Sequence, residues 1–423
     1  MTNIEIINIG PIKHIKIDLN QINVFMGPQS SGKSTIAKII SQCFWFEKNY
    51  ILTGEEYYFY GGLIDFHRMD DSYFSDDSEI TYDSLWVKIT FKGKGKKSKI
   101  SVIRNDISTD IYHNLKIEYI PAERNFVSAI SNLEKYSDSY DNIINFLNDW
   151  MIFKETLTNK KDFSSPLKSI NIKYKYNSTK KEDVITLPNR KKVNLQRASS
   201  GQQSIMPLLV VCEYLFNELY NQKRNPSPAE RKNIQNLLPD NMKSDYKWVI
   251  DMQNFHNNEI EQNSNKEVEI VKKKIWNKLG FSTDYNHSTV IIEEPEQNLF
   301  PETQKELIYH LFECIKVKNR QHNLVLTTHS PYILYAINNC LMGNLVSNQD
   351  MDKIEKAEFL ETNFLSRKSW ISPKLISIWE IHNGTLKQIQ DEDNILSENY
   401  FDIKMTDLTD EYYQLLNYYK DEK

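Results

Sequence analysis

The spacing of apolar and polar residues changes several times along the chain, and these changes predict a mixed α/β fold. Alternating residues near the N-terminus predict short strands, and the apolar run 22–26 ends at Gly27. A helical spacing of apolar residues begins at about Lys33. Two β-rich runs, 86–91 and 99–103, flank a turn rich in glycine and lysine and predict a hairpin.

The second half of the chain alternates between helical and strand patterns. The region 126–222 predicts a helical lobe, and the polar region 223–287 predicts an inserted helical subdomain. Apolar strands near 290–292 and 324–327 follow, with a helical pattern between them. We therefore expect an α/β domain, with a mixed sheet and flanking helices, over 1–340.

A smaller C-terminal unit is expected over 341–423. Apolar alternation at 375–379 and the turn at Asn383-Gly384 predict a small α/β extension suited to contacting a partner.

Composition narrows the class of protein. The 423 residues are 40% hydrophobic and 26% charged, which is typical of a globular protein of two or three units. No apolar run approaches the roughly 18 residues of a membrane span, and the start lacks an export signal, so we expect a cytoplasmic protein without a membrane partner. The net charge of −5 argues against a wholly basic nucleic-acid-binding protein.

The cysteines argue against a disulfide framework and against zinc. They are scattered, and no pair forms a C-x-x-C motif. The four are Cys43, Cys212, Cys314 and Cys340.

The segment 27–35, GPQSSGKST, fits the phosphate-binding pattern G-x-x-x-x-G-K-[ST] between a strand and a helix. Its glycines let backbone N–H groups surround phosphate oxygens, and the following helix directs its positive end at them. Lys33 supplies a cation for the β- and γ-phosphates, and the Ser34 hydroxyl is placed to bind Mg²⁺. The candidate ATP-binding residues are Gly27, Gln29, Ser30, Ser31, Gly32, Lys33, Ser34 and Thr35.

Two later strands end in candidate catalytic residues. The run 290–292 leads to Glu293, expected to orient Mg²⁺, and Glu294, expected to act as the general base or to position the attacking water. The run 324–327 leads to His329, which is placed to donate a hydrogen bond to the γ-phosphate.

A second anion site is predicted at the start of the helix near residue 201. The segment 198–204, ASSGQQS, opens with a serine and a glycine, which expose backbone N–H groups and a hydroxyl. Ser200, Gly201 and Gln202 are therefore further candidate ATP-binding residues. An ordinary capped helix is the alternative interpretation.

Together and in this order, the four motifs resemble the ABC ATPase superfamily. Within it the chain is most similar to the ATPases of the OLD (overcoming lysogenisation defect) family and their stand-alone relatives in bacterial anti-phage systems, such as the Septu ATPase. The similarity rests on Ser-Ser-Gly-Gln-Gln at the helix start, on Glu-Glu-Pro-Glu followed by 298–301 (NLFP), and on 119–124 (YIPAER). The sequence departs from the wider superfamily in having Glu293 where aspartate is usual. No glutamine-loop match is secure, and Glu123 or Arg124 stands near that position.

The resemblance implies a head-to-tail homodimer, or a higher even-numbered homo-oligomer. Ser200 and Gly201 of one copy would contact the γ-phosphate held by Lys33 of the other. The region 341–423 lacks the paired strand and acid motifs of the Toprim nuclease that OLD nucleases carry. We therefore expect an ATPase that regulates a separate effector, a nuclease, in anti-phage defence.

Two alternatives stay open. A RecF-like DNA-binding ATPase of repair or recombination needs a continuous basic surface, whereas the sequence offers clusters at 92–99, 180–181 and 190–192. DNA binding is therefore undecided. A transporter ATPase is disfavoured by the long polar segment between the Ser-Gly helix and the acidic strand.

Overall fold

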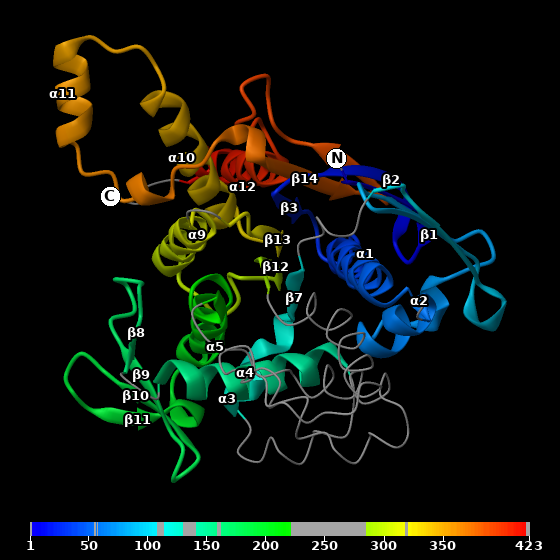
Figure 1. The fold of residues 1–423 in the computed structure, drawn as a ribbon. Coiled ribbons are helices and arrows are strands. Elements are labelled where there is room, and N and C mark those ends of the chain that lie inside the picture. Colours follow the sequence, from blue (N-terminus) through cyan, green and yellow to red (C-terminus); the bar gives the residue numbers. More distant parts are fainter. Residues whose placement is uncertain are drawn as a thin grey trace.

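The computed structural model describes residues 2–54, 56, 58–107, 114–129, 141–158, 162–220, 285–317 and 320–419. These residues form three β-sheets with helices packed against them (Figure 1). The expected helical insert at 223–287 lies outside the described residues, apart from 285–287.

A six-stranded sheet forms the centre of the molecule, in the order β15-β14-β3-β13-β12-β7. Five of its strands are parallel, and β15 pairs antiparallel with β14 at one edge. The strands are β3 (Ile22–Met26), β7 (Leu115–Ile120), β12 (His287–Glu293), β13 (Asn323–Thr328), β14 (Ile376–His382) and β15 (Thr385–Gln388).

Both faces of this sheet are covered, which explains why its central strands are apolar almost throughout. Side chains alternate between the two faces, so Phe25 and Val325 contribute to the core beside α1 (Lys33–Thr53). Val24 and Leu326 contribute to the opposite core, with α5 (Ser200–Phe216), α9 (Pro301–Ile315) and α10 (Pro331–Ser347).

The second sheet is antiparallel and has the order β2-β1-β4-β5-β6. The predicted hairpin is confirmed as its β5–β6 pair, with Phe91 opposite Ile100. Its apolar face packs on α1, so α1 lies between two sheets (Figure 1). The elements are β1 (Thr2–Ile9), β2 (Ile12–Leu19), β4 (Glu79–Asp83), β5 (Val87–Lys92), β6 (Lys99–Arg104) and the short helix α2 (Phe59–Gly61).

The predicted lobe at 126–222 contains a third sheet as well as helices. This antiparallel sheet has the order β11-β10-β9-β8 and lies beside α4 and α5 (Figure 1). The elements are α3 (Phe126–Ala129), α4 (Asn142–Thr158), β8 (Phe163–Ser164), β9 (Lys173–Asn177), β10 (Glu182–Thr186) and β11 (Lys192–Asn194).

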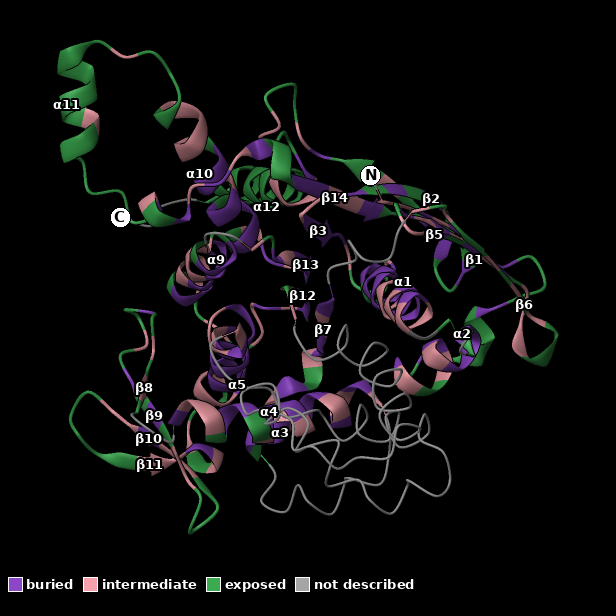
Figure 2. Cartoon of the chain, viewed as in Figure 1, coloured by how far each residue is buried: buried purple, intermediate pink, exposed green. Residues whose placement is uncertain are grey.

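The C-terminal region adds two strands to the central sheet. The predicted turn at Asn383-Gly384 joins β14 to β15, and β14 pairs with β3, the strand that leads into 27–35. By contrast, α11 (Lys353–Glu361) and most of α12 (Tyr400–Leu416) are exposed (Figure 2). Among the described residues, every helix is too short or too polar to cross a membrane.

Candidate active site

The candidate residues gather at one edge of the central sheet. Because β3, β13 and β12 are adjacent and parallel, their carboxyl ends meet there, which is where α/β sheets bind ligands. A cavity of about 480 Å³ opens at this edge. It is lined by Pro11, Gln29, Ser30, Ser31, Gly32, Lys33, Ser34, Thr35, Tyr73, Glu294 and His329.

The loop 27–35 has the backbone that a phosphate cradle requires. Gly27 and Gly32 have φ values of 151° and 108°, which only glycine adopts without strain. A Cβ at Gly27 would also lie 2.5 Å from the Ile381 carbonyl oxygen on β14. The following helix, α1, begins at Lys33, so its N-terminal N–H groups face the cavity.

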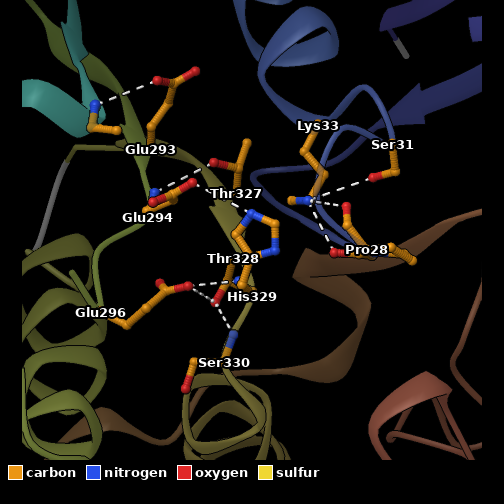
Figure 3. Close-up of polar contacts among 12 residues, drawn as sticks. Pro28, Ser31, Lys33, Glu293, Glu294, Glu296, Thr327, Thr328, His329 and Ser330 are labelled. Atoms are coloured by element: carbon orange, nitrogen blue, oxygen red, sulfur yellow. Dashed lines mark hydrogen bonds and ion pairs between the residues drawn. The ribbon is translucent and has the colours of Figure 1, made fainter. Parts of the chain in front are cut away.

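Lys33 is held inside the loop. Its Nζ donates to the carbonyl oxygens of Gly27 at 2.9 Å and of Pro28 at 2.8 Å (Figure 3). Burial lowers the pKa of Lys33 to about 8, although Glu294 and Glu296 oppose that shift. The ammonium therefore stays charged at neutral pH, as contact with phosphate demands.

Glu294 and His329 lie in contact with each other at the wall of the cavity. His329 Nε2 lies 3.4 Å from Glu294 Oε1, and both residues come from strand ends (Figure 3). The hydrogen bond from His329 lowers the pKa of Glu294, so its carboxylate is ionised and able to accept a proton. The backbone N–H of Glu294 donates to the Thr327 carbonyl at 3.0 Å, which ties the two strand ends together.

Glu296 accepts hydrogen bonds from the segment that carries His329. Its Oε1 accepts from the Thr328 hydroxyl at 2.9 Å and from the His329 backbone N–H at 2.6 Å. Burial raises the pKa of Glu296. Sequence reasoning placed this residue only within an acidic motif and did not foresee its contact with the histidine strand.

Arg124 makes contacts with the acidic strand end that sequence reasoning did not predict. It lies in the turn after β7 and is 1% exposed. Its guanidinium donates to the carbonyl oxygens of Glu293 and Glu294, both at 2.8 Å, and of Pro295 at 3.3 Å. Arg124 therefore fixes the backbone that carries the candidate base. The sequence feature that could have drawn attention to Arg124 is the segment 119–124, in which it lies.

Glu293 turns away from the cavity. Its Oε1 accepts from the Tyr119 hydroxyl at 2.6 Å. Its Oε2 accepts from the Ala122 N–H at 3.4 Å (Figure 3). The expected role of Glu293 at Mg²⁺ stays a prediction. The cavity itself offers the Ser34 hydroxyl and the Glu294 carboxylate, and oxygen donors of this kind suit Mg²⁺.

The second predicted anion site lies apart from this cavity. Ser199 caps α5 by accepting from the Gln202 N–H at 3.4 Å, and Ser200 is exposed. A Cβ at Gly201 would lie 2.9 Å from the Asn298 carbonyl oxygen, so the start of α5 passes close to the loop after Glu294. Ser200, Gly201 and Gln202 are not among the lining residues. Their contact with nucleotide in a second copy stays a prediction.

Several solved structures resemble the chain at low sequence identity. The SMC head domain from Thermotoga maritima is 10% identical, with a TM-score of 0.37, over 92% of this chain and 98% of that one. The recombination mediator protein RecF is 11% identical, with a TM-score of 0.33, over 92% and 97%. A dimeric ATP-binding cassette bound to ADP and Pi is 11% identical, with a TM-score of 0.30, over 92% and 99%. At these scores the similarities carry no functional conclusion.

The family comparison is decisive for the class. No curated protein matches the chain in sequence. The profile of a family described as an AAA domain matches residues 3–280, which include the loop 27–35. The prediction of an α/β fold with a mixed sheet and flanking helices is confirmed, and its finer assignment to an ABC-type P-loop ATPase head stays a prediction. The chain belongs to this AAA-domain family of P-loop ATPases.

Proposed function

We propose that this chain binds ATP with Mg²⁺ at the loop 27–35 and hydrolyses it with Glu294 as the base. The observation that carries the proposal is the meeting of Lys33, Glu294 and His329 in one cavity at the ends of adjacent strands. A phosphate cradle and an ionised carboxylate on opposite walls are what attack of water on a γ-phosphate needs.

Each residue has a distinct task in this reaction. The backbone N–H groups of the loop and Lys33 hold the β- and γ-phosphates. Ser34 would hold Mg²⁺, which neutralises phosphate charge when bound. Glu294 orients the attacking water and accepts its proton, because its lowered pKa keeps the carboxylate ionised. His329, which lies beside Glu294, would donate a hydrogen bond to the γ-phosphate.

Glu294→Gln tests this assignment. The amide cannot accept the proton, so ATP turnover should fall by about 100-fold or more while ATP affinity is retained. Glu302→Gln, on the exposed first turn of α9, is the matched control and should keep normal turnover. Normal turnover in the Glu294 variant would contradict the proposal.

Lys33→Ala tests nucleotide binding separately. Removing the ammonium takes away the cation expected at the β- and γ-phosphates, so ATP affinity should fall sharply. Equilibrium binding of a fluorescent ATP analogue measures this. An unchanged ATP affinity would show that Lys33 does not bind the phosphates.

We further propose that two copies enclose ATP between them. Ser200 and Gly201 of one copy then contact the γ-phosphate bound to the other. The exposed start of α5 supports this, because the first N–H groups of a helix lack partners within the helix and favour an anion there. Loss of the γ-phosphate on hydrolysis would reopen the dimer.

The ATPase cycle is proposed to control a separate effector, a nuclease, in anti-phage defence. The resemblance to stand-alone OLD-like ATPases supports this, as do the apolar side chains that the C-terminal region exposes, including Leu360, Met405 and Leu408. Co-expression with the product of the adjacent reading frame, followed by affinity purification, should recover a stable complex. Full DNase activity of this chain purified alone would contradict the proposal that a separate effector is the nuclease.

A further inference from the structure

Three side chains that are common metal ligands meet between α5 and α9, away from the nucleotide cavity. Glu213 comes from α5, and His310 and Cys314 come from α9. Their ligand atoms all lie within 4.8 Å of one another. We infer that Glu213, His310 and Cys314 form a binding site for a transition-metal ion of the zinc type.

The local geometry follows from helix spacing. Residues four positions apart lie on the same face of an α-helix, so His310 and Cys314 project together toward α5. Their Sγ and Nε2 atoms are 3.5 Å apart. Two ligands at tetrahedral angles on zinc, with bonds of about 2.3 Å to sulfur and about 2.0 Å to nitrogen, are separated by roughly 3.5 Å. The pair therefore needs little rearrangement to bind one ion.

The donor set selects the class of ion. One sulfur, one nitrogen and one carboxylate oxygen suit Zn²⁺ or Co²⁺, whereas Mg²⁺ and Ca²⁺ prefer oxygen ligands alone. Three protein ligands leave the fourth tetrahedral position to water. The ion is thus chemically distinct from the Mg²⁺ expected at Ser34.

The two α9 ligands differ in their protonation states. Burial lowers the pKa of His310 to about 4, so its ring is neutral and offers a lone pair at pH 7. Burial raises the pKa of the Cys314 thiol well above its usual range, so a bound ion would have to displace the thiol proton.

An ion can reach the cluster from one side. His310 is half-buried and lines a cavity of about 360 Å³ beside α9, together with Glu306, Tyr309 and Glu313. Basic side chains, Lys168, Arg367 and Lys368, also line this cavity, so its wall has mixed charge.

This inference departs from the expectation that the scattered cysteines exclude zinc. Spacing along the chain reveals ligand sets carried by one short motif, but not a set that two packed helices bring together. A bound ion would join α5, which begins at Ser200, to α9, which follows the loop after Glu294.

Cobalt titration of the full-length, metal-stripped protein tests the site without reference to ATPase activity. Co²⁺ bound to thiolate has a strong near-ultraviolet absorption that an oxygen-only site lacks. We expect one such Co²⁺ per chain, displaced by one equivalent of Zn²⁺ and not by Mg²⁺. We also expect Zn²⁺ to raise the melting temperature of the wild type.

Cys314→Ser and His310→Gln each remove one ligand and should weaken Co²⁺ binding by about 100-fold or more, since even outer-shell changes cost 10- to 100-fold. Cys340→Ser, at a fully buried thiol on α10, is the control and should retain the absorption. Circular dichroism of the metal-free variants separates misfolding from ligand loss. The proposal is overturned if the folded wild type shows no thiolate absorption, or if Cys314→Ser keeps it. The cluster is then only a thiol–imidazole hydrogen bond.

Discussion

Glu294, the proposed base, has a backbone conformation that is costly for a residue with a side chain. Its φ of 43° lies in the left-handed region, at a cost of about 1 to 2 kcal/mol. Arg124 offsets this cost, because its guanidinium donates to the carbonyl oxygens of Glu293, Glu294 and Pro295. Arg124 is therefore a positioning residue for the candidate base.

Arg124→Met should separate positioning from binding. Methionine fills a similar space but leaves three carbonyl oxygens without their donor, so the free energy of unfolding should fall by about 3 kcal/mol. We expect kcat to fall at least about tenfold with KM nearly unchanged, because the base is displaced while the phosphate cradle stays intact. Steady-state ATPase kinetics measure this split.

The control for this substitution is Arg104→Met, at an exposed position on β6, which should change neither constant. Arg124→Lys keeps one charged donor and should recover part of the turnover. Equal losses in kcat and in ATP affinity would mean that Arg124 only holds the fold together.

The lowered pKa of Lys33 predicts a pH dependence of ATP binding. Burial brings this pKa to about 8 in the nucleotide-free chain, so the ammonium loses its proton as the pH rises through 8. Bound phosphates favour the charged form, so ATP affinity should fall by up to about tenfold per pH unit above 8. Binding isotherms at pH 7, 8 and 9 check this. Lys33→Ala should bind weakly at every pH, and a flat wild-type profile would argue against the assigned charge.

Sequence patterns located the candidate residues Glu293 and Glu294 at a strand end, but not the side chains that contact them. The strand-then-acid pattern at 290–294 located Glu293 and Glu294, but it could not show that β7 lies beside β12. That neighbour supplies the Tyr119 hydroxyl that binds Glu293. Contacts of this kind depend on which strands pair, and strand order is not encoded in local alternation.

At the scale of elements, the contact between α1 and β4 contains a buried carboxyl group. Glu47 on α1 accepts hydrogen bonds from the hydroxyls of Tyr82 and Ser84. Burial outweighs these bonds and raises its pKa to about 7 from an ordinary 4.5. In the folded protein Glu47 therefore binds a proton over a pH range where the unfolded chain has released it.

Glu47 should make stability fall as the pH rises from about 4.5 to 7. Below 4.5 both states are protonated and the stabilising difference is fully present, whereas above 7 it is lost. Glu47→Gln stays neutral, so it should match wild type at pH 4 and exceed it by roughly 3 kcal/mol at pH 8. Urea unfolding of both proteins at the two pH values gives this difference directly. If the free energy of unfolding changed equally with pH in both proteins, the raised pKa of Glu47 would be contradicted.

The C-terminal strands show what sequence periodicity leaves open at this scale. Alternation at 375–379 and the Asn383-Gly384 turn predicted a small α/β extension, and the structure has β14 and β15 joined by that turn. The partner of β14 is β3, more than 300 positions earlier, in a parallel pairing that no local turn specifies. Such pairing depends on long-range packing over α10, so the sequence alone indicated a separate extension.

At the scale of the whole molecule, the two predicted phosphate contacts are on separate surfaces. The exposed start of α5 contributes no residue to the cavity at 27–35, so in the proposed dimer its contact with nucleotide would be made to the other copy. In a head-to-tail pair, each nucleotide would therefore need groups from both copies.

Mixing two inactive variants tests this dependence. Lys33→Ala disables the cradle, and Ser200→Arg blocks the start of α5 without disturbing the buried core, because Ser200 is exposed. A mixed pair has one site built from the intact cradle of the Ser200 variant and the intact α5 of the Lys33 variant. Random pairing at equal amounts should then restore about a quarter of the wild-type sites. Trapped radiolabelled ATP counts those sites even if hydrolysis requires both. If each site were completed within a single chain, no mixture would recover any.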